Sequence, residues 1–166
     1  FIPHIKTTKE AKDAVNSCLY PPFGARGSSG FTRSSNYGMS QFSTHKDSQN
    51  SKIFICILIE SLEGLENLTS IIKSCPRIDC IYFGTYDIAS SMGIDSPKSK
   101  EVSELIDNAM QITLKIKPLI LFGQVAHTVE ESNNFSKKIS IIPLIVDCGL
   151  ISKSFSMHVK KFNQLK

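Results

Sequence analysis

Residues 53–60 read IFICILIE, seven apolar residues in a row followed by a carboxylate. The apolar residues do not alternate with polar ones, which is the pattern of a β-strand buried on both faces, as in a parallel sheet. Three later runs share this length and isoleucine-rich composition, at 78–83, 119–122 and 139–146, and the chain opens inside another at 1–5. The sequence therefore predicts five buried strands.

The segments between these runs have the apolar spacing of helices. Apolar residues recur every three or four positions over 62–72 and over 102–110, as on the buried side of an amphipathic helix. Helix starts are indicated by hydroxyl residues followed by glutamate or proline at capping positions: Thr7 with Glu10, Thr128 with Glu131, and Ser96 with Pro97. This alternation predicts an α/β fold with a parallel sheet, either doubly wound or closed as an eight-stranded barrel.

One segment interrupts the alternation. Residues 20–49 begin with Tyr20-Pro21-Pro22 and are rich in glycine and serine. We interpret the region of about 20–50 as a long ordered loop with room for one short helix, and loops of this length are usually functional or mobile. With no internal repeat in the sequence, we expect residues 1–166 to form a single domain.

Composition limits the classes of function. The chain has 166 residues, 41% hydrophobic and 20% charged, as in ordinary globular domains. Its net charge of +4 comes from Lys and Arg residues scattered along the chain. Because they form no dense basic patch, this pattern disfavours nucleic-acid binding, and the charge is compatible with the binding of small anionic substrates. The longest apolar stretch, 139–151, is interrupted by Ser140, Pro143 and Asp147, so we expect no membrane span.

The cysteines and the start of the chain carry further expectations. The five cysteines show no Cys-x-x-Cys spacing: Cys18, Cys56, Cys75, Cys80 and Cys148. We interpret them as buried free thiols of a protein in a reducing compartment, the cytoplasm.

Because the sequence opens without Met and inside an expected strand, we also expect it to be a fragment.

Two acidic residues follow expected strands. Glu60 ends the stretch quoted above, and Asp87 comes soon after the run 78–83. The carboxyl ends of parallel strands hold the active site in α/β folds, and neighbouring strands lie about 4.8 Å apart. The two carboxylates could therefore hold one divalent cation (Mg, Mn or Co), with water and substrate as further ligands. Alternatively, Glu60 caps the helix beginning near Leu62, and Asp87 caps a turn at Ile88.

Other residues could contact a small anion. Gly84, Thr85 and Tyr86 lead into Asp87, and their backbone amides could hold a carboxylate because a glycine lets the chain approach closely. Arg26 lies among two prolines and two glycines. Its guanidinium could meet a carboxylate in the barrel or in a partner subunit, or form a salt bridge that only anchors the loop.

The histidines carry weaker expectations. His4 ends the first run and could face the same site, although a lone histidine there is more often part of hydrogen-bonded structure. We interpret His45, His127 and His158 as surface residues. The sequence contains no nucleophile elbow and no glycine-rich phosphate loop, so neither hydrolase nor nucleotide-binding chemistry is indicated.

Four motifs, in this order, resemble one family. They are IPHIKTTKEA at 2–11, YPPFGARG at 20–27, IE at 59–60 and GTYDI at 84–88, and Asp147 fits the end of a closing strand. From Phe1 to about Ser154 the chain resembles the HpcH/HpaI aldolase/citrate lyase family, of which 4-hydroxy-2-oxoheptanedioate aldolase, a class II pyruvate aldolase, is a typical member.

This resemblance implies a fold and an activity. The fold would be an incomplete (β/α)8 TIM barrel of which strands 4 to 8 are present, and the reaction would be metal-dependent cleavage of a 4-hydroxy-2-oxo acid into pyruvate and an aldehyde through an enolate. Glu60 and Asp87 would be the metal ligands, and Gly84 to Tyr86 would hold the substrate carboxylate. The family's general base His and the Arg that stabilises the enolate would lie upstream of Phe1. The protein would be a homo-oligomer.

Departures from the family pattern keep alternatives open. Leu58 stands where many members carry Gln, Thr85-Tyr86 replaces a frequent Pro-Ala, and Cys80 replaces the usual Gly. The first two changes line the substrate side, so the substrate stays undecided. The alternatives are a catalytically silent, truncated or noncatalytic barrel relative and a citrate lyase-like acyl-CoA lyase.

Overall fold

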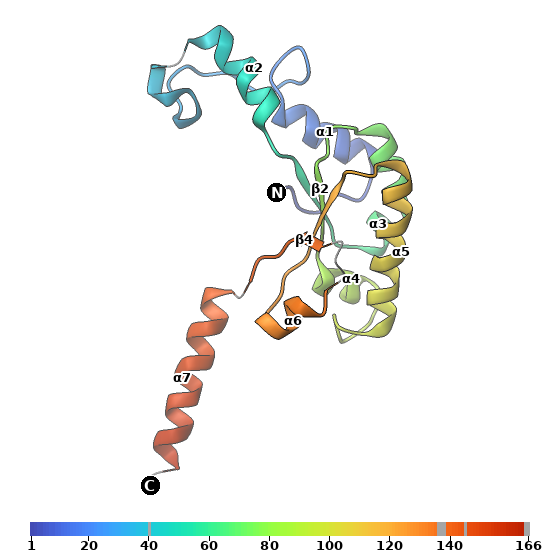
Figure 1. The fold of residues 1–166 in the computed structure, drawn as a ribbon, viewed down its shortest axis with the longest axis vertical. Helices are drawn as coiled ribbons and strands as arrows, with labels where there is room; N and C mark the ends of the chain where they lie inside the picture. The colour runs from blue at the N-terminus through green and yellow to red at the C-terminus, as the bar shows by residue number, and fades with distance from the viewer. Residues whose placement is uncertain (40, 136–138, 145, 165–166) are drawn as a thin grey trace.

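A parallel four-stranded sheet forms the centre of the protein in a computed structural model that describes residues 1–39, 41–135, 139–144 and 146–164 (Figure 1). The strands, in the order β1-β2-β3-β4, are Cys56–Ile59, Cys80–Phe83, Leu121–Gly123 and Ile139–Ile141. A bridge from Ile2 to Ile57 places the start of the chain beside β1, and one from Ala126 to Leu144 continues the last pair. Spatial order thus follows sequence order, as in a barrel and unlike a doubly wound sheet.

The strands are shorter than the apolar runs that predict them. β1 and β2 occupy the second part of the runs 53–59 and 78–83. Of the run 139–146, β4 uses only the beginning, Leu144 forms an isolated bridge, and Ile145 lies outside the described residues. The expected strand at 1–5 is reduced to the Ile2 bridge, because Pro3 has no N–H to donate and His4 adopts a φ of 58°.

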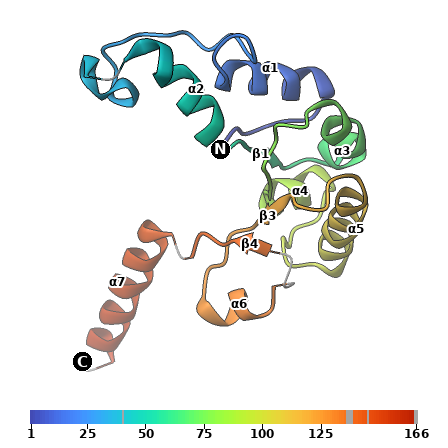
Figure 2. The same ribbon diagram turned by 45° about the horizontal axis from the view of Figure 1, so that its top comes forward.

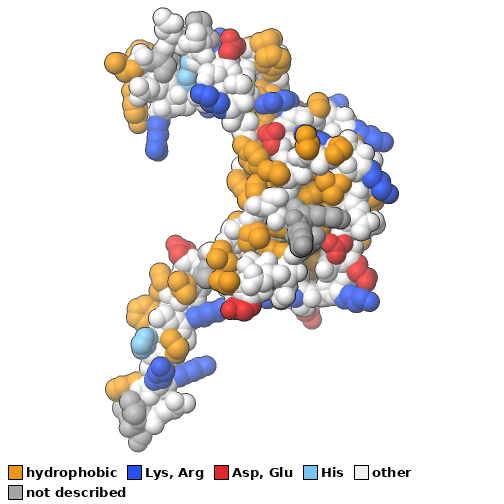
Figure 3. Space-filling view, viewed as in Figure 1, with side chains coloured by type: hydrophobic (Ala, Val, Ile, Leu, Met, Phe, Trp, Pro, Cys, Tyr) orange, Lys and Arg blue, Asp and Glu red, His pale blue; other side chains and the backbone are white. Residues whose placement is uncertain are grey.

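Helices cover one face of the sheet. α1 (Thr8–Cys18), α3 (Leu62–Ser74) and α5 (Lys100–Ile116) form this layer, as Figures 1 and 2 show. Alternate strand residues, Ile57 and Ile59 in β1 and Ile81 and Phe83 in β2, join apolar residues of these helices in one buried core. Among the described residues no helix layer covers the opposite face, and hydrophobic side chains gather along the concave side of the molecule (Figure 3).

Helix caps agree with two of the three expected starts. The Thr7 side chain accepts from the Glu10 N–H, and Glu10 returns a bond to the Thr7 N–H, so the capping box of α1 is confirmed. Thr128 caps α6 (Val129–Asn133) by accepting from the Glu131 N–H. The expected start at Ser96-Pro97 is wrong, because α5 begins later with Ser99 as its N-cap.

The segment expected to be mainly loop contains more helix than predicted. It holds the 3-10 helix η1 (Arg33–Gly38) and most of α2 (Phe42–Lys52). The Asn50 side chain anchors α2 by accepting from the Tyr20 N–H at 2.8 Å and donating to the Tyr20 carbonyl at 3.1 Å. His45 packs edge-on against the Tyr20 ring and is only 7% exposed, so its interpretation as a surface residue is wrong.

The last helix stands apart from the sheet. α7 (Asp147–Asn163) projects away from the other elements (Figure 1), and none of its described residues is buried. Asp147 is its first residue, which corrects the expectation that Asp147 ends a strand. No helix among the described residues has both the length and the apolar character needed to cross a membrane.

The cysteines are free among the described residues. Cys56, Cys75 and Cys80 are buried and Cys18 is partly buried, as expected, but Cys148 is exposed at the start of α7. Cys56 and Cys80 lie opposite each other in register. A hydrogen bond between their thiols lowers the pKa of Cys56 and, together with burial, raises the pKa of Cys80. The reducing cytoplasmic location stays a prediction.

Candidate functional site

Glu60 is a buried, oriented carboxylate at the carboxyl end of the sheet. It directly follows β1 and is 9% exposed. Its Oε1 accepts a hydrogen bond from the His4 backbone N–H at 2.7 Å. The alternative that Glu60 caps α3 is wrong, because Ser61 is the N-cap and its side chain accepts from the Gly64 N–H. Helix capping therefore does not account for this carboxylate.

His4 lies at the same place, as the sequence suggested. Its Nδ1 is 3.1 Å from Glu60 Oε1, and its side chain is 73% exposed. The φ of 58° is uncommon outside glycine, and with this backbone the His4 N–H reaches Glu60. The strained conformation thus fixes the orientation of one carboxylate, which is where such strain is often found.

Gly84 lets the next strand end pack directly against Glu60. The Gly84 N–H donates to the Ile59 carbonyl at 3.1 Å. A Cβ at Gly84 would lie 2.7 Å from Glu60 Cβ and 2.9 Å from Glu60 Oε2, closer than two such atoms approach in proteins. The predicted need for glycine here is therefore explained by the Glu60 side chain itself.

Asp87 occupies the first turn of a short helix above the same edge. β2 ends at Phe83, and α4 (Thr85–Ser91) begins directly after its N-cap Gly84. Asp87 is exposed and comes soon after β2, as expected, but it lies inside α4, so the alternative that it caps a turn at Ile88 is wrong. The first amides of a helix lack intrahelical acceptors, and no side chain caps α4. These amides, Thr85 and Tyr86 included, are available to an anion.

The donor set suits a hard divalent cation that keeps open positions. Two carboxylates at one sheet edge match the oxygen ligands that Mg and Mn prefer, with water and substrate as the others. Within the described ranges, no cluster of three or more His, Cys, Asp or Glu could hold an ion. Glu60 Oε2 lies beside Gly84, and a role for it as a metal ligand stays a prediction.

A second pair of side chains meets at this edge. The Tyr86 hydroxyl and His127 Nε2 are 3.2 Å apart, with the rings edge to face at 5.7 Å. His127 is partly buried and its contact with Tyr86 is exposed to solvent, so its interpretation as a surface residue is not contradicted. It follows the last residue of β3 at the same spacing at which Asp87 follows the last residue of β2, and that spacing is the signal that could have identified it.

Glu131 of α6 fixes the loop that carries His127. Its Oε2 accepts from the His127 backbone N–H at 2.8 Å, and its Oε1 lies 3.0 Å from Lys98 Nζ. Burial acts to raise the pKa of Glu131, but the His127 N–H and the Lys98 ammonium more than offset it, and the pKa falls below its ordinary value. The ion pair thus links α6 to the segment before α5.

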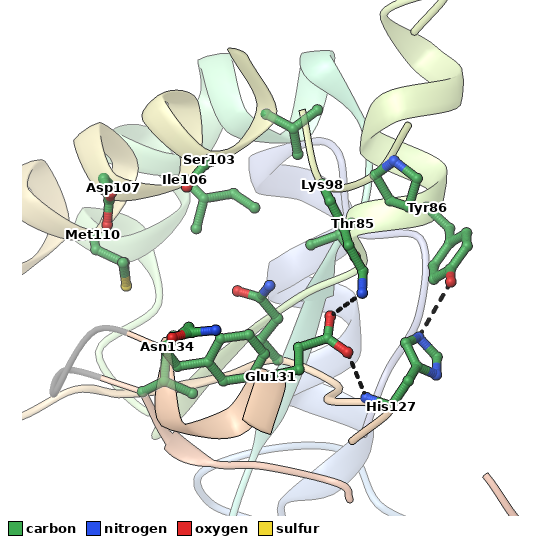
Figure 4. Close-up of a pocket in the computed structure, with 15 residues that line it drawn as sticks. Thr85, Tyr86, Lys98, Ser103, Ile106, Asp107, Met110, His127, Glu131 and Asn134 are labelled. Carbon is green, nitrogen blue, oxygen red and sulfur yellow. Dashed lines mark hydrogen bonds and ion pairs between the residues drawn. The ribbon is translucent and has the colours of Figure 1, made fainter. Parts of the chain in front are cut away.

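A cavity of about 440 Å³ adjoins these residues. Figure 4 shows it between α5 and α6, with the Lys98–Glu131 ion pair and the Tyr86–His127 contact at one end and Ile106 and Met110 on the α5 side. Thr85 and Tyr86, two of the residues predicted to bind substrate, line it. The cavity therefore touches the residues that lead into Asp87.

Arg26 lies elsewhere. Its guanidinium carbon is 4.6 Å from the centre of the Tyr20 ring, a cation–π contact. The ion pairs among the described residues do not include Arg26, so the alternative of a loop-anchoring salt bridge finds no support there. A role toward a partner subunit stays a prediction.

Comparison with known proteins identifies relatives of this chain. The family model described as HpcH/HpaI aldolase/citrate lyase matches residues 1–155. A hydroxypyruvate/pyruvate aldolase of Sagittula stellata is 32% identical over 106 residues, 63% of this chain and 41% of that protein. A 5-keto-4-deoxy-D-glucarate aldolase of Shigella boydii is 36% identical over 92 residues, 55% of this chain and 35% of that protein.

Solved structures agree on the fold. A crystal structure of an HpcH/HpaI aldolase from Desulfitobacterium hafniense superposes with a TM-score of 0.87 at 19% identity, over 99% of this chain and 63% of that chain. Such neighbours have a TIM-barrel fold, so the expected barrel architecture is confirmed. The chain spans 35% to 41% of the length of the two aldolases named above.

Proposed function

Because this chain belongs to the HpcH/HpaI aldolase/citrate lyase family, we propose that it supplies the metal-holding part of an aldolase that cleaves a 4-hydroxy-2-oxo acid into pyruvate and an aldehyde. The observation that carries the proposal is Glu60, buried at the carboxyl edge, oriented by His4 and packed against Gly84. Asp87 one helical turn above that glycine supplies the second carboxylate. This arrangement of two acids is what a class II aldolase site needs.

Each residue then has a defined task. Glu60 and Asp87 hold a divalent cation (Mg, Mn or Co), which when bound stabilises the negative charge that develops on the 2-oxo oxygen as the carbon–carbon bond breaks. The first amides of α4, at Thr85 and Tyr86, donate to the carboxylate of the 2-oxo acid. The His4 N–H keeps Glu60 in the orientation that ligation requires. The general base and an arginine at the oxygen are proposed to come from outside this sequence.

Conservative substitutions test the ligands. Glu60→Gln and Asp87→Asn in the complete protein are expected to lower metal-dependent pyruvate release at least a hundredfold. Gln can still accept from the His4 N–H, so Glu60→Gln tests ligation rather than folding. Glu66→Gln, an exposed acid on α3, is the matched control and is expected to leave the rate unchanged. Full activity in both site variants would refute the assignment.

The same assay separates the alternatives. Cleavage that requires coenzyme A would favour a citrate lyase-like acyl-CoA lyase. Absence of turnover in the complete wild-type protein, with each of the three metals supplied, would favour a catalytically silent relative.

We also propose that the protein is a homo-oligomer. The support is α7, which exposes five large apolar side chains: Leu150, Ile151, Phe155, Met157 and Val159. Such a surface is unfavourable in water unless another surface covers it. Light scattering is expected to give more than one subunit per particle, and Phe155→Glu is expected to reduce the mass. A monomeric wild type would contradict the proposal.

A further inference from the structure

We propose that Cys56 and Cys80 form an oxidation site, at which a small peroxide converts the two thiols into a disulfide that joins β1 to β2. The site is independent of the proposed aldolase reaction, which uses neither thiol. Three features of the Cys56–Cys80 pair support it: the position of the two residues in the sheet, the contact between their sulfur atoms, and their burial.

The two cysteines are direct neighbours in the sheet. Cys56 is the first residue of β1, Cys80 is the first residue of β2, and they are register partners in this parallel pair. Adjacent strands lie about 4.8 Å apart, and the Cα atoms of a disulfide are usually about 4.4–6.8 Å apart. The backbone spacing of β1 and β2 is therefore compatible with a disulfide at this position.

Both side chains point to the same side of the sheet. Side chains alternate between the two faces along a strand, and register partners share a face. Ile57 and Ile81, the next residues, belong to the core under the helices, so the two cysteines face the concave side. Their thiols are hydrogen-bonded to each other. The sulfur atoms are thus already in contact, and side-chain rotation can bring them to bonding distance.

The hydrogen bond makes the two thiols chemically unequal. It lowers the pKa of Cys56 and, together with burial, raises the pKa of Cys80. The thiolate, not the thiol, is the nucleophile, and a thiol that titrates more easily is oxidised more easily. Cys56 is therefore the residue that reacts first, and Cys80 lies beside it as the second thiol that completes the disulfide.

The oxidation takes two balanced steps. The Cys56 thiolate attacks one oxygen of hydrogen peroxide, so that an S–O bond forms, the O–O bond breaks, and the departing hydroxide takes up the Cys56 proton as water. The Cys80 sulfur then attacks the Cys56 sulfenic acid, so that the S–S bond forms, the S–O bond breaks, and hydroxide leaves with the Cys80 proton as a second water. The sulfur atoms lose two electrons, and the peroxide oxygens gain them.

Burial restricts the oxidant to a small molecule. Both cysteines are 0% exposed. On the same side of the sheet, the rings of Phe1 and Tyr82 meet edge to face with their centres 5.9 Å apart. A thiol without exposed surface is out of reach of a bulky disulfide such as oxidised glutathione, whereas hydrogen peroxide is little larger than water. The pair is therefore suited to a peroxide and not to thiol exchange.

Peptide mapping of the complete protein tests the site. The folded protein is treated with hydrogen peroxide, its remaining thiols are blocked with N-ethylmaleimide in urea, and it is digested with trypsin. Cross-linking of the peptides that carry Cys56 and Cys80 is expected, with the loss of two hydrogen atoms, and dithiothreitol is expected to separate them. Oxidised glutathione in place of peroxide is expected to leave both thiols free. Trypsin places the three buried cysteines on separate peptides: Cys56 on 53–73, Cys75 on 74–77 and Cys80 on 78–98.

Cys75 provides the matched control. It is also buried and free, and it lies much closer to Cys80 along the chain than Cys56 does. Because a shorter loop costs less entropy to close, peroxide treatment in urea is expected to join Cys75 to Cys80 more often than Cys56 to Cys80. In the folded protein, Cys75→Ser is expected to leave the cross-link unchanged, whereas Cys56→Ser and Cys80→Ser are each expected to abolish it.

Three results would overturn the proposal. If both thiols of the folded protein stay free under peroxide that oxidises the urea-treated sample, the Cys56–Cys80 pair is inert packing. If the folded protein joins Cys75 to Cys80, the strand register does not direct the pairing. A glutathione adduct on Cys56 in the folded protein would refute the restriction to a small oxidant.

Discussion

Gly84→Ala is the substitution whose effect follows most directly from the structure. The added methyl would lie 2.7 Å from Glu60 Cβ and 2.9 Å from Glu60 Oε2, whereas nonbonded carbon atoms prefer about 3.5–4.0 Å. The Glu60 side chain would have to move by about an ångström. Its bond to the His4 N–H, now 2.7 Å, would lengthen or break.

The expected magnitude follows from these contacts. Overpacking by one methyl group costs about 1–3 kcal/mol of unfolding free energy, and the upper part of that range applies if the bond to His4 is lost as well. Because Glu60 would no longer be aimed correctly, affinity for Mn is expected to fall about 10- to 100-fold, the usual effect of disturbing the support of a ligand.

Urea unfolding and calorimetric Mn titration of the complete protein measure the two effects. Gly30→Ala is the matched control, because a Cβ there meets no atom within 4 Å, and it is expected to change neither quantity. If Gly84→Ala unfolds within 0.5 kcal/mol of wild type, a margin typical of neutral surface changes, and binds Mn equally well, the explanation given for Gly84 is wrong.

Three further substitutions have defined outcomes. Thr7→Ala removes the cap of α1 and should lower the unfolding free energy by about 0.5–2 kcal/mol; an unchanged urea midpoint would contradict this role. Lys117→Met removes the hydrogen bonds that Nζ donates to the carbonyls of Pro76 and Ile78, and their loss should lower the unfolding free energy by about 1–3 kcal/mol. Burial of the ammonium lowers the pKa of Lys117, and relief of that burial in the variant offsets part of the loss. Equal stability of variant and wild type would show that the desolvation of Lys117 cancels its hydrogen bonds. Because the folded-state pKa of Glu131 is lowered, its stabilisation is present above the unfolded pKa of about 4.3 and is lost as pH falls through the folded value. The stability difference between wild type and Glu131→Gln should therefore shrink in acid, and a difference that grows below pH 4 would contradict the sign.

The central sheet and one acid of the site could be predicted from the sequence. The apolar run before Glu60 has strand length, is rich in β-branched residues and does not alternate, and these three features together favour a buried strand. Because this strand ends at Ile59, Glu60 lies at the carboxyl edge of the sheet. The sequence indicates that another group approaches Gly84 closely. The structure shows that this group is the Glu60 side chain, and no local sequence pattern reveals that contact.

The rest depends on tertiary contacts or on ambiguous local patterns. α2 carries little apolar periodicity and is anchored by Asn50, a contact that sequence spacing does not indicate. The apolar stretch that includes Asp147 continues from β4 into α7, and periodicity alone does not separate a buried strand from the start of a helix in such a stretch. His127 carries one local signal, its spacing after β3, and the contact with Tyr86 that accompanies it is tertiary.

A crystal structure of the complete protein with Mn and pyruvate tests the central claim most directly, since anomalous scattering locates the ion independently of the model. The account predicts one Mn with carboxylate oxygens of both Glu60 and Asp87 at about 2.0–2.3 Å, in the range of small hard cations. An ion bound away from these two side chains, or held by only one of them, would contradict it.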